Sequence, residues 1–307
     1  MKSSSRREYF SRIHIFAYGC NAMRYIILII LLALSLALQF LVGDFPVTFL
    51  TSPLNLILFF CWLLTVIWTW RSARKSLFVR FMLSPSATRW ALFMMLLLCL
   101  VIGLTGKRNL THAWPSVLAF LFFQTVLMYV ILRGYRKATA TGERLGAVRW
   151  RFVFLHAGLL LAAISLFWGA PDKREFRVKA FRDVPVREAF SVDGRTEWLP
   201  YMMEMKDFDV TVGQDGVPSD YSALVEVDGT EVLLKVNHPH TVRFGEDIYL
   251  LGYDAAMGRN SEYCILQIVR DPWKYGVVTG VIMMLIGALM LFVGGPDRRS
   301  ASVSEIE

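Results

Sequence analysis

Residues 152–169 form the segment that most constrains the fold of this chain, because they are predominantly apolar and include one ionisable side chain, His156. A helix of about 20 predominantly apolar residues is long enough to cross a bilayer. An ionisable group inside the membrane costs free energy and by default indicates a function. The segment therefore predicts a membrane-spanning helix in which His156 is a candidate functional residue.

Five further apolar runs have a similar length, so the sequence predicts six membrane-spanning helices. In chain order the six runs are residues 23–42, 54–70, 90–105, 114–132, 152–169 and 275–293. The composition agrees, because 55% of the residues are hydrophobic, 19% are charged and the mean hydropathy is +0.45. Such a chain is too apolar to be one soluble domain. The polar N-terminal segment lacks the pattern of a cleavable signal peptide.

The distribution of positive charge predicts which loops face the cytoplasm. Lys and Arg are concentrated in residues 1–24, 71–89 and 133–151, beside the apolar runs. The positive-inside rule places these segments in the cytoplasm, and six spans then place both termini there and residues 170–272 outside. Lys107 and Arg108, in a loop expected outside, are the one conflict with the rule. The formal net charge of +8 is thus explained by topology, and we do not expect nucleic-acid binding.

Residues 170–272 have the pattern of β structure. Residues 224–227 and 230–236 alternate apolar and polar side chains and are joined by Asp228 and Gly229. An Asp-Gly pair between two alternating runs is a strong hairpin signal, because both turn positions need a positive φ. Residues 207–212, 248–253 and 263–269 are further candidate strands. The predicted fold class is therefore a polytopic α-helical membrane protein with six spanning helices and one small all-β extracytoplasmic domain.

Small residues lie on one face of the last span and on one face of the fifth span. Those of the last span are Gly276, Gly280 and Gly287, and those of the fifth span are Gly158, Ala162, Ser165 and Gly169. Small faces let helix backbones approach closely in a membrane, so we expect the fifth span to pack on a neighbouring helix through this face. At 100° per residue His156 points to the other side, where Ala163 leaves space beside the ring for a flat ligand.

The cysteines argue against a thiol–disulfide enzyme. Cys20, Cys61, Cys99 and Cys264 have neither CxxC nor metal-ligand spacing, and Cys264 is the single cysteine of residues 170–272. A disulfide within the outer domain is therefore impossible. The sequence also has no nucleophile–base arrangement, phosphate loop or zinc-ligand spacing, so an independent enzyme is the least favoured class.

An ordered set of short motifs gives the chain a family resemblance. In chain order they are Leu155-His156-Ala157-Gly158, Leu199-Pro200, Lys206-Asp207-Phe208, residues 216–222, Val236-Asn237-His238-Pro239, Ile248-Tyr249, Gly252-Tyr253, Asp271-Pro272 and Gly280. Over residues 88–295 this set resembles the ResB family, also called CcsB, of cytochrome c biogenesis proteins. The first two spans are additional to the family pattern. The expected domains are residues 1–88 with two additional spans, 89–169 with three spans of the ResB-like core, the β domain 170–272, and 273–307 with the final span and a cytoplasmic tail.

The resemblance implies a function in haem handling. It implies a membrane subunit of a cytochrome c biogenesis complex that carries haem b across the bacterial inner membrane and presents it for attachment to apocytochrome c. The β domain would lie in the periplasm. The expected partners are a CcsA-like haem-handling membrane protein, apocytochrome c and a thiol-reducing thioredoxin-like protein. The thioether chemistry would take place mainly on the CcsA-like partner, so this chain is at most one subunit of a haem-attachment enzyme, a cytochrome c synthase.

The resemblance also implies that His156 is one axial ligand of the haem iron, with the second ligand supplied by the partner. A neutral imidazole is a good haem ligand, and the alternative is an interfacial histidine that bonds a neighbouring backbone group. His112, beside Trp114 at the start of the fourth span, is a second candidate for haem contact, against an ordinary loop residue. His238 and His240 flank Pro239, and we expect a surface turn there rather than a metal or second haem site.

Two other classes of function stay open at this point. One is a scaffold subunit that orders a CcsA-like partner and does not bind haem. The other is a transporter or sensor whose outer domain binds a different small ligand and which works without a CcsA-like partner.

Overall fold

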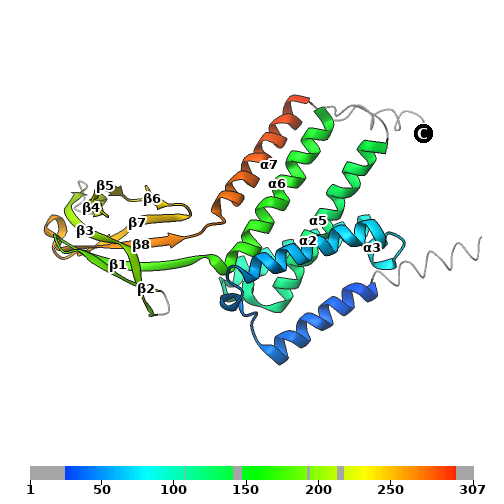
Figure 1. Cartoon of the computed structure of the whole chain (residues 1–307), viewed down its shortest axis with the longest axis horizontal. Coiled ribbons are helices and arrows are strands. Elements are labelled where there is room, and N and C mark those ends of the chain that lie inside the picture. The colour runs from blue at the N-terminus through cyan, green and yellow to red at the C-terminus, as the bar shows by residue number, and fades with distance from the viewer. Residues whose placement is uncertain (1–24, 107, 141–146, 192–193, 213–217, 295–307) are drawn as a thin grey trace, which may run out of the picture. The chain divides into compact units, whose positions relative to one another are not determined.

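The computed structural model describes residues 25–106, 108–140, 147–191, 194–212 and 218–294. The chain divides into two compact units, shown in Figure 1. The helical unit comprises the described parts of Met1–Pro171 and Gly276–Glu307, and the sheet unit is Asp172–Tyr275.

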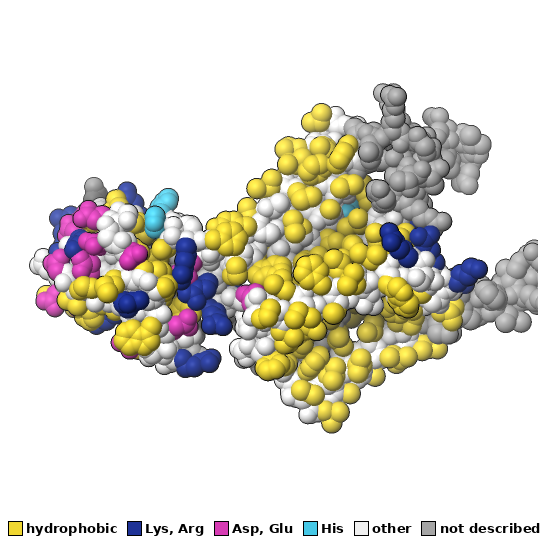
Figure 2. All heavy atoms as spheres, in the orientation of Figure 1, with side chains coloured by type: hydrophobic (Ala, Val, Ile, Leu, Met, Phe, Trp, Pro, Cys, Tyr) yellow, Lys and Arg dark blue, Asp and Glu magenta, His cyan; other side chains and the backbone are white. Residues whose placement is uncertain are grey.

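Within the described ranges, six helices are long and apolar enough to cross a membrane, which confirms the six predicted helices. They are Tyr25–Val42, α2 (Leu54–Ser72), α4 (Pro85–Thr105), α5 (Trp114–Ala140), α6 (Ala147–Gly169) and α7 (Lys274–Gly294). Large apolar side chains such as Phe40, Leu96 and Leu104 are exposed on these helices. Figure 2 shows hydrophobic side chains covering most of the drawn face of the helical unit, whereas charged side chains are most frequent on the drawn face of the sheet unit. Apolar surface of this extent is typical of contact with lipid.

Two serines determine where the chain between α2 and α4 becomes helical. Ser76 caps the short helix α3 (Leu77–Met82), since its side chain accepts a hydrogen bond from the Val79 amide. Ser84 caps α4 in the same way, and Pro85 occupies the first helical position, where its missing N–H is not needed. Helix α4 therefore begins five residues before the predicted start at Trp90, and α3 was not predicted.

Helices α6 and α7 pack backbone against backbone through their small residues. A Cβ atom at Gly280 would lie 2.5 Å from the carbonyl oxygen of Gly158 and 2.7 Å from the amide nitrogen of Ala162. A Cβ atom at Gly287 would lie 2.8 Å from Leu155 Cγ. These distances are too short for any side chain. The predicted small face of α6 is confirmed, and its partner is α7.

The sheet unit contains one eight-stranded antiparallel sheet, so the prediction of a small sheet was wrong. The strands are β1 (Arg174–Phe181), β2 (Val186–Ser191), β3 (Thr196–Val212), β4 (Pro218–Val227), β5 (Thr230–Lys235), β6 (His240–Arg243), β7 (Glu246–Tyr253) and β8 (Tyr263–Arg270), in the spatial order β5-β4-β3-β2-β1-β8-β7-β6. Strands β1, β2 and β6 were not predicted. In β1, long charged side chains alternate with the buried residues Phe176, Val178 and Ala180. Because so many residues of this segment are charged, the alternation was not recognised as a strand in the sequence.

The predicted hairpin is confirmed between β4 and β5. Val227 pairs with Thr230 in antiparallel register, and the intervening Asp228 and Gly229 have φ angles of +50° and +81°. Both turn residues thus adopt the left-handed backbone that a tight hairpin turn requires.

The sheet folds over on itself around one apolar core. The Tyr221 hydroxyl on β4 donates a hydrogen bond to the Leu251 carbonyl on β7 at 3.1 Å, although these strands are far apart in the spatial order. The core includes Met203, Leu266 and Cys264, all without solvent exposure. Burial raises the pKa of the Cys264 thiol to about 12, so the thiol stays protonated and is a poor nucleophile.

A buried carboxylate links strands within the sheet unit. Glu246 on β7 has 1% of its surface exposed. It accepts hydrogen bonds from the Tyr201 hydroxyl at 2.5 Å, from Arg270 Nε at 2.6 Å and from Arg243 at 3.1 Å. Burial raises the pKa of Glu246, but these three hydrogen bonds outweigh burial, and the net pKa is lower than its ordinary value. Glu246 is therefore ionised at neutral pH.

The glycine contact between α6 and α7 generates the first prediction. The variant Gly280→Ala should destabilise the helical unit by about 1–3 kcal/mol, because the added methyl group forces two backbones apart. Thermal unfolding of the full chain in detergent measures this effect. Gly103→Ala on α4 is the matched control, since a Cβ atom there meets nothing within 4 Å. Equal unfolding temperatures for the two variants would contradict the close packing.

The ionised state of Glu246 predicts an acid-labile sheet unit. Because its pKa is lower in the folded chain, Glu246 stabilises the fold above its ordinary pKa of 4.5, and this stability is lost as the pH falls through the lower folded-state pKa. Hydrogen–deuterium exchange of β7 and β8 in the full chain, corrected for intrinsic rates, should therefore accelerate below that ordinary value. Glu246→Gln should weaken protection at neutral pH by about 3 kcal/mol and reduce the acid-dependent step. An unchanged acid-dependent step in this variant would refute the assignment.

Candidate functional site

His156 lies half-buried on α6, and one of its ring nitrogens is already occupied. The Nδ1 atom is 2.9 Å from the carbonyl oxygen of Phe152, one helical turn earlier. A carbonyl can only accept a hydrogen bond, so Nδ1 carries a proton, and in the neutral imidazole Nε2 then keeps its lone pair. This tautomer leaves Nε2 as the atom that can bind a metal.

The Phe152 ring fixes the orientation of the imidazole. The two rings stack with their centroids 4.1 Å apart. Phe152 in turn lies against Gly134 of α5, where a Cβ atom would be 2.5 Å from Phe152 Cε1. Helix α5 thus provides the space for the ring that supports His156. Because Gly158 faces α7, His156 lies on a different side of α6, as the sequence predicts.

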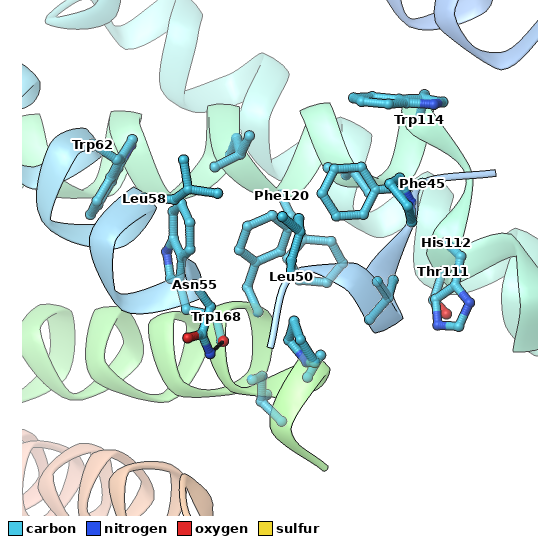
Figure 3. Close-up of a pocket in the computed structure, with 18 residues that line it drawn as sticks. Phe45, Leu50, Asn55, Leu58, Trp62, Thr111, His112, Trp114, Phe120 and Trp168 are labelled. Atoms are coloured by element: carbon cyan, nitrogen blue, oxygen red, sulfur yellow. Dashed lines mark hydrogen bonds between the residues drawn. The ribbon is translucent and has the colours of Figure 1, made fainter. Parts of the chain in front are cut away.

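A cavity of about 740 Å³ lies at the other end of α6, near Gly169 (Figure 3). We call it the tryptophan cavity, after Trp62, Trp114 and Trp168. The described residues that line it are Phe45, Pro46, Val47, Leu50, Asn55, Leu58, Trp62, Thr111, His112, Trp114, Val117, Phe120, Leu121, Leu166, Phe167, Trp168, Ala170 and Pro171. Its volume falls within the range of about 300–1,000 Å³ that is typical of small-molecule and cofactor sites.

Two buried amide side chains join the helices around the tryptophan cavity. Asn55 Nδ2 on α2 donates to the Trp168 carbonyl at 2.9 Å, as Figure 3 shows. The Trp168 indole N–H donates to Gln124 Oε1 on α5 at 3.1 Å, and Gln124 Nε2 donates to the Ala163 carbonyl at 3.3 Å. Helices α2, α5 and α6 are therefore held together by polar contacts in an apolar environment.

The loop side of the tryptophan cavity is built from the segments before α2 and α5. The amide of Phe45 donates to the carbonyl of His112, at the end of the 3₁₀ helix η2 (Arg108–His112), at 2.8 Å. The Phe45 ring meets Trp114 edge-on at 4.9 Å between centroids. The Trp114 amide donates to Gln39 Oε1 at 2.8 Å. These contacts hold His112 and Trp114 at the rim.

Two polar groups at this rim have no hydrogen-bond partner within the described residues. One is the indole N–H of Trp114, which is buried. The other is the His112 imidazole, which is exposed and lines the cavity. A buried donor without an acceptor costs free energy.

The predicted candidate residues lie in separate places. His112 lines the tryptophan cavity and His156 does not. His238 and His240 are exposed in and before β6, and across the described ranges no three or more His, Cys, Asp and Glu side chains gather where they could hold a metal ion. Sequence reasoning missed Asn55 and Gln124. The sequence contained a signal for both residues, because a polar amide within a spanning segment indicates a specific contact.

Comparison with known proteins supports the family resemblance. Residues 128–261 match the model of the ResB-like family, which confirms the resemblance predicted from the motifs. The match includes His156 and begins after His112. A solved structure of a cytochrome c heme lyase, CcmF, is similar over 66% of this chain and 33% of that chain, with 14% sequence identity and a TM-score of 0.38. This chain thus spans about a third of the length of that protein. No curated protein matches.

The buried amides around the tryptophan cavity generate the third prediction. Gln124→Leu should destabilise the full chain by about 1–3 kcal/mol, because the indole N–H of Trp168 would be left buried without an acceptor. Thermal unfolding in detergent measures this change. Thr65→Val is the control, since Thr65 is exposed and its hydroxyl donates to the Cys61 carbonyl of its own helix. Its effect should remain within about 0.5 kcal/mol, and an equal loss in both variants would contradict a specific role for Gln124.

Proposed function

Because residues 128–261 match the ResB-like family, we propose that this chain is a membrane subunit of a cytochrome c biogenesis complex. In this proposal haem is the cargo, carried across the membrane and presented for attachment to apocytochrome c. The observation that most supports haem binding is the hydrogen bond from His156 Nδ1 to the Phe152 carbonyl, since it leaves Nε2 free.

The surroundings of His156 fit an axial ligand of haem. Haem supplies an iron atom whose axial positions bind imidazole nitrogen. A metal-binding histidine commonly donates its other N–H to a backbone carbonyl, which fixes the ring and its tautomer. His156 has this arrangement with Phe152, and the stacked Phe152 ring restricts its rotation. The second axial ligand comes from a CcsA-like partner.

The remaining parts of the chain have supporting roles in this proposal. The protein resides in the bacterial inner membrane with both termini in the cytoplasm, and the sheet unit lies in the periplasm. There the sheet unit docks the CcsA-like partner and presents apocytochrome c, whose cysteines are kept reduced by a thioredoxin-like protein. The thioether bonds form mainly on the partner, so this chain is one part of a haem-attachment enzyme.

The absorption spectrum of the complex tests the role of His156. The full chain is purified together with its CcsA-like partner, as wild type and as His156→Ala. The haem Soret band should be lost in the variant and partly restored by added imidazole, because imidazole can replace the missing ligand. His238→Ala is the matched histidine control and should keep the wild-type band, since His238 is exposed on the sheet unit.

Two other outcomes are informative. An unchanged Soret band in His156→Ala would remove His156 from the site and favour a scaffold subunit that orders the partner without binding haem. An intact complex that carries no haem, in wild type and variants alike, would overturn the proposed function.

A further inference from the structure

We propose that the turn between β6 and β7, formed by Phe244 and Gly245, is a membrane contact of the sheet unit. In this contact the Phe244 ring enters the interfacial region of a lipid bilayer. The partner is the boundary between headgroups and acyl chains, not the charge of a particular lipid. The inference goes beyond the proposed function, because it does not involve haem and concerns only how the sheet unit meets the membrane.

The side chain of Phe244 is not explained by the turn itself. Arg243 pairs with Glu246 across the hairpin, so Phe244 and Gly245 are its two turn residues. Gly245 has a φ angle of +74°, a conformation that favours glycine. Turn positions are dominated by small or polar residues and proline, yet Phe244 has a large apolar ring that is 75% exposed. Neither the turn conformation nor the core of the sheet unit therefore accounts for this ring.

The turn is fixed to the start of α7. The Asp271 amide donates to the Gly245 carbonyl at 2.6 Å, and a Cβ atom at Gly245 would lie 2.7 Å from Pro272 Cα. The Phe244 ring stacks on Tyr275, in the first turn of α7, with the ring centroids 4.8 Å apart. All these residues belong to the sheet unit. The turn and the beginning of the helix therefore form one local structure.

The Phe244 ring continues an exposed apolar face of α7. Five residues spaced three or four apart on this helix are each between 39% and 63% exposed, namely Tyr275, Val278, Ile282, Leu285 and Leu289. This spacing places them on one face. Helix α7 is long and apolar enough to cross a membrane, so lipid covers such a face. Because Phe244 stacks on the first of these residues, it lies where the lipid-facing surface of α7 begins.

Aromatic side chains at this position suit the interface of a bilayer. Trp273 immediately precedes α7, and its indole N–H donates to Asp172 at 2.8 Å. Tyr275 follows in the first turn of the helix. Trp and Tyr are enriched at the two membrane–water interfaces, and moving the exposed Phe244 ring out of water is favourable. The β6–β7 turn thus adds a third ring to the aromatic residues at the start of the span.

The cations near the turn already have partners, which argues against a site for an anionic headgroup. Lys274 Nζ donates to Asp247 at 2.5 Å. Arg243 and Arg270 both donate to Glu246. A cation that is paired with a carboxylate adds little attraction for an anionic lipid. The contact should therefore be the same in zwitterionic and in anionic bilayers.

Spin labels on the full chain, reconstituted in phosphatidylcholine nanodiscs, test this contact. Each label is attached to one new cysteine, in Phe244→Cys, Met257→Cys or Leu285→Cys. Met257 is the matched control, because it is 49% exposed and lies beyond the far end of β7, whose eight residues span about 26 Å. Leu285, in the middle of α7, is the reference for a label in lipid.

The depth of each label is measured by its collisions with oxygen, which partitions into lipid, and with a water-soluble nickel chelate. The native cysteines Cys20, Cys61 and Cys99 are first replaced by alanine. Cys264 is retained, because its buried thiol does not react with the label.

The label in Phe244→Cys should lie at a depth between those in Leu285→Cys and Met257→Cys, with oxygen reaching it better than the chelate does. Access of the chelate equal to that in Met257→Cys would overturn the contact, because the turn would then face water. Protection from both reagents would also overturn it, since a protein surface such as a second copy would then cover the turn. A lipid depth that appears only after phosphatidylglycerol is added would overturn it as well, because charge would then be the cause.

Hydrogen–deuterium exchange of β6 in the same nanodiscs separates membrane contact from stacking on Tyr275. Phe244→Leu loses the stacked ring and keeps an apolar side chain, so β6 should exchange within about twofold of the wild-type rate. Phe244→Asp places a charge in the interface, and β6 should exchange about tenfold faster. Met257→Asp is the control and should leave β6 unchanged. Equal acceleration in Phe244→Leu and Phe244→Asp would overturn the proposal, because stacking alone would then explain the ring.

Discussion

The close backbone contact between Gly158 on α6 and Gly280 on α7 determines how α6 is oriented. Once that face of α6 is occupied by α7, the other faces are left for α5 and α2. Phe152 lies against Gly134 of α5, and the Trp168 carbonyl accepts the amide of Asn55 on α2. Each contact uses a different side of one helix, so the position of His156 and one wall of the tryptophan cavity both follow from the packing of α6.

The two units satisfy their buried polar groups in different ways. In the helical unit the hydrogen-bond partners are neutral amide side chains. Gln124, for example, accepts from the Trp168 indole and donates to the Ala163 carbonyl. In the sheet unit the partner is an ionised group, with Glu246 held by Tyr201 and two arginines. A neutral amide suits an apolar environment, where an unpaired charge would be very costly. A paired carboxylate is tolerated where arginines that reach the surface can surround it.

Much of the fold could be predicted from the sequence, because the signals for its helices and for one hairpin lie within short segments of the chain. Spans follow from the length of apolar runs, and the β4–β5 hairpin follows from Asp228 and Gly229. The size of the sheet could not be predicted, because the charged outer face of β1 concealed the buried Phe176. The tryptophan cavity could not be predicted either, because its walls come from three separate parts of the chain. Trp62 and Trp168 have no local sequence signal that brings them together.

The burial of Cys264 has a consequence for redox chemistry. Its side chain has no solvent exposure, and its thiol pKa of about 12 keeps it protonated. Disulfide exchange requires a thiolate that a partner sulfur can reach, and this thiol meets neither condition. In the function proposed above, in which the sheet unit lies beside the cysteines of apocytochrome c, Cys264 would therefore form no mixed disulfide with them. The sheet unit could bind a protein with reactive cysteines without forming a covalent bond to it.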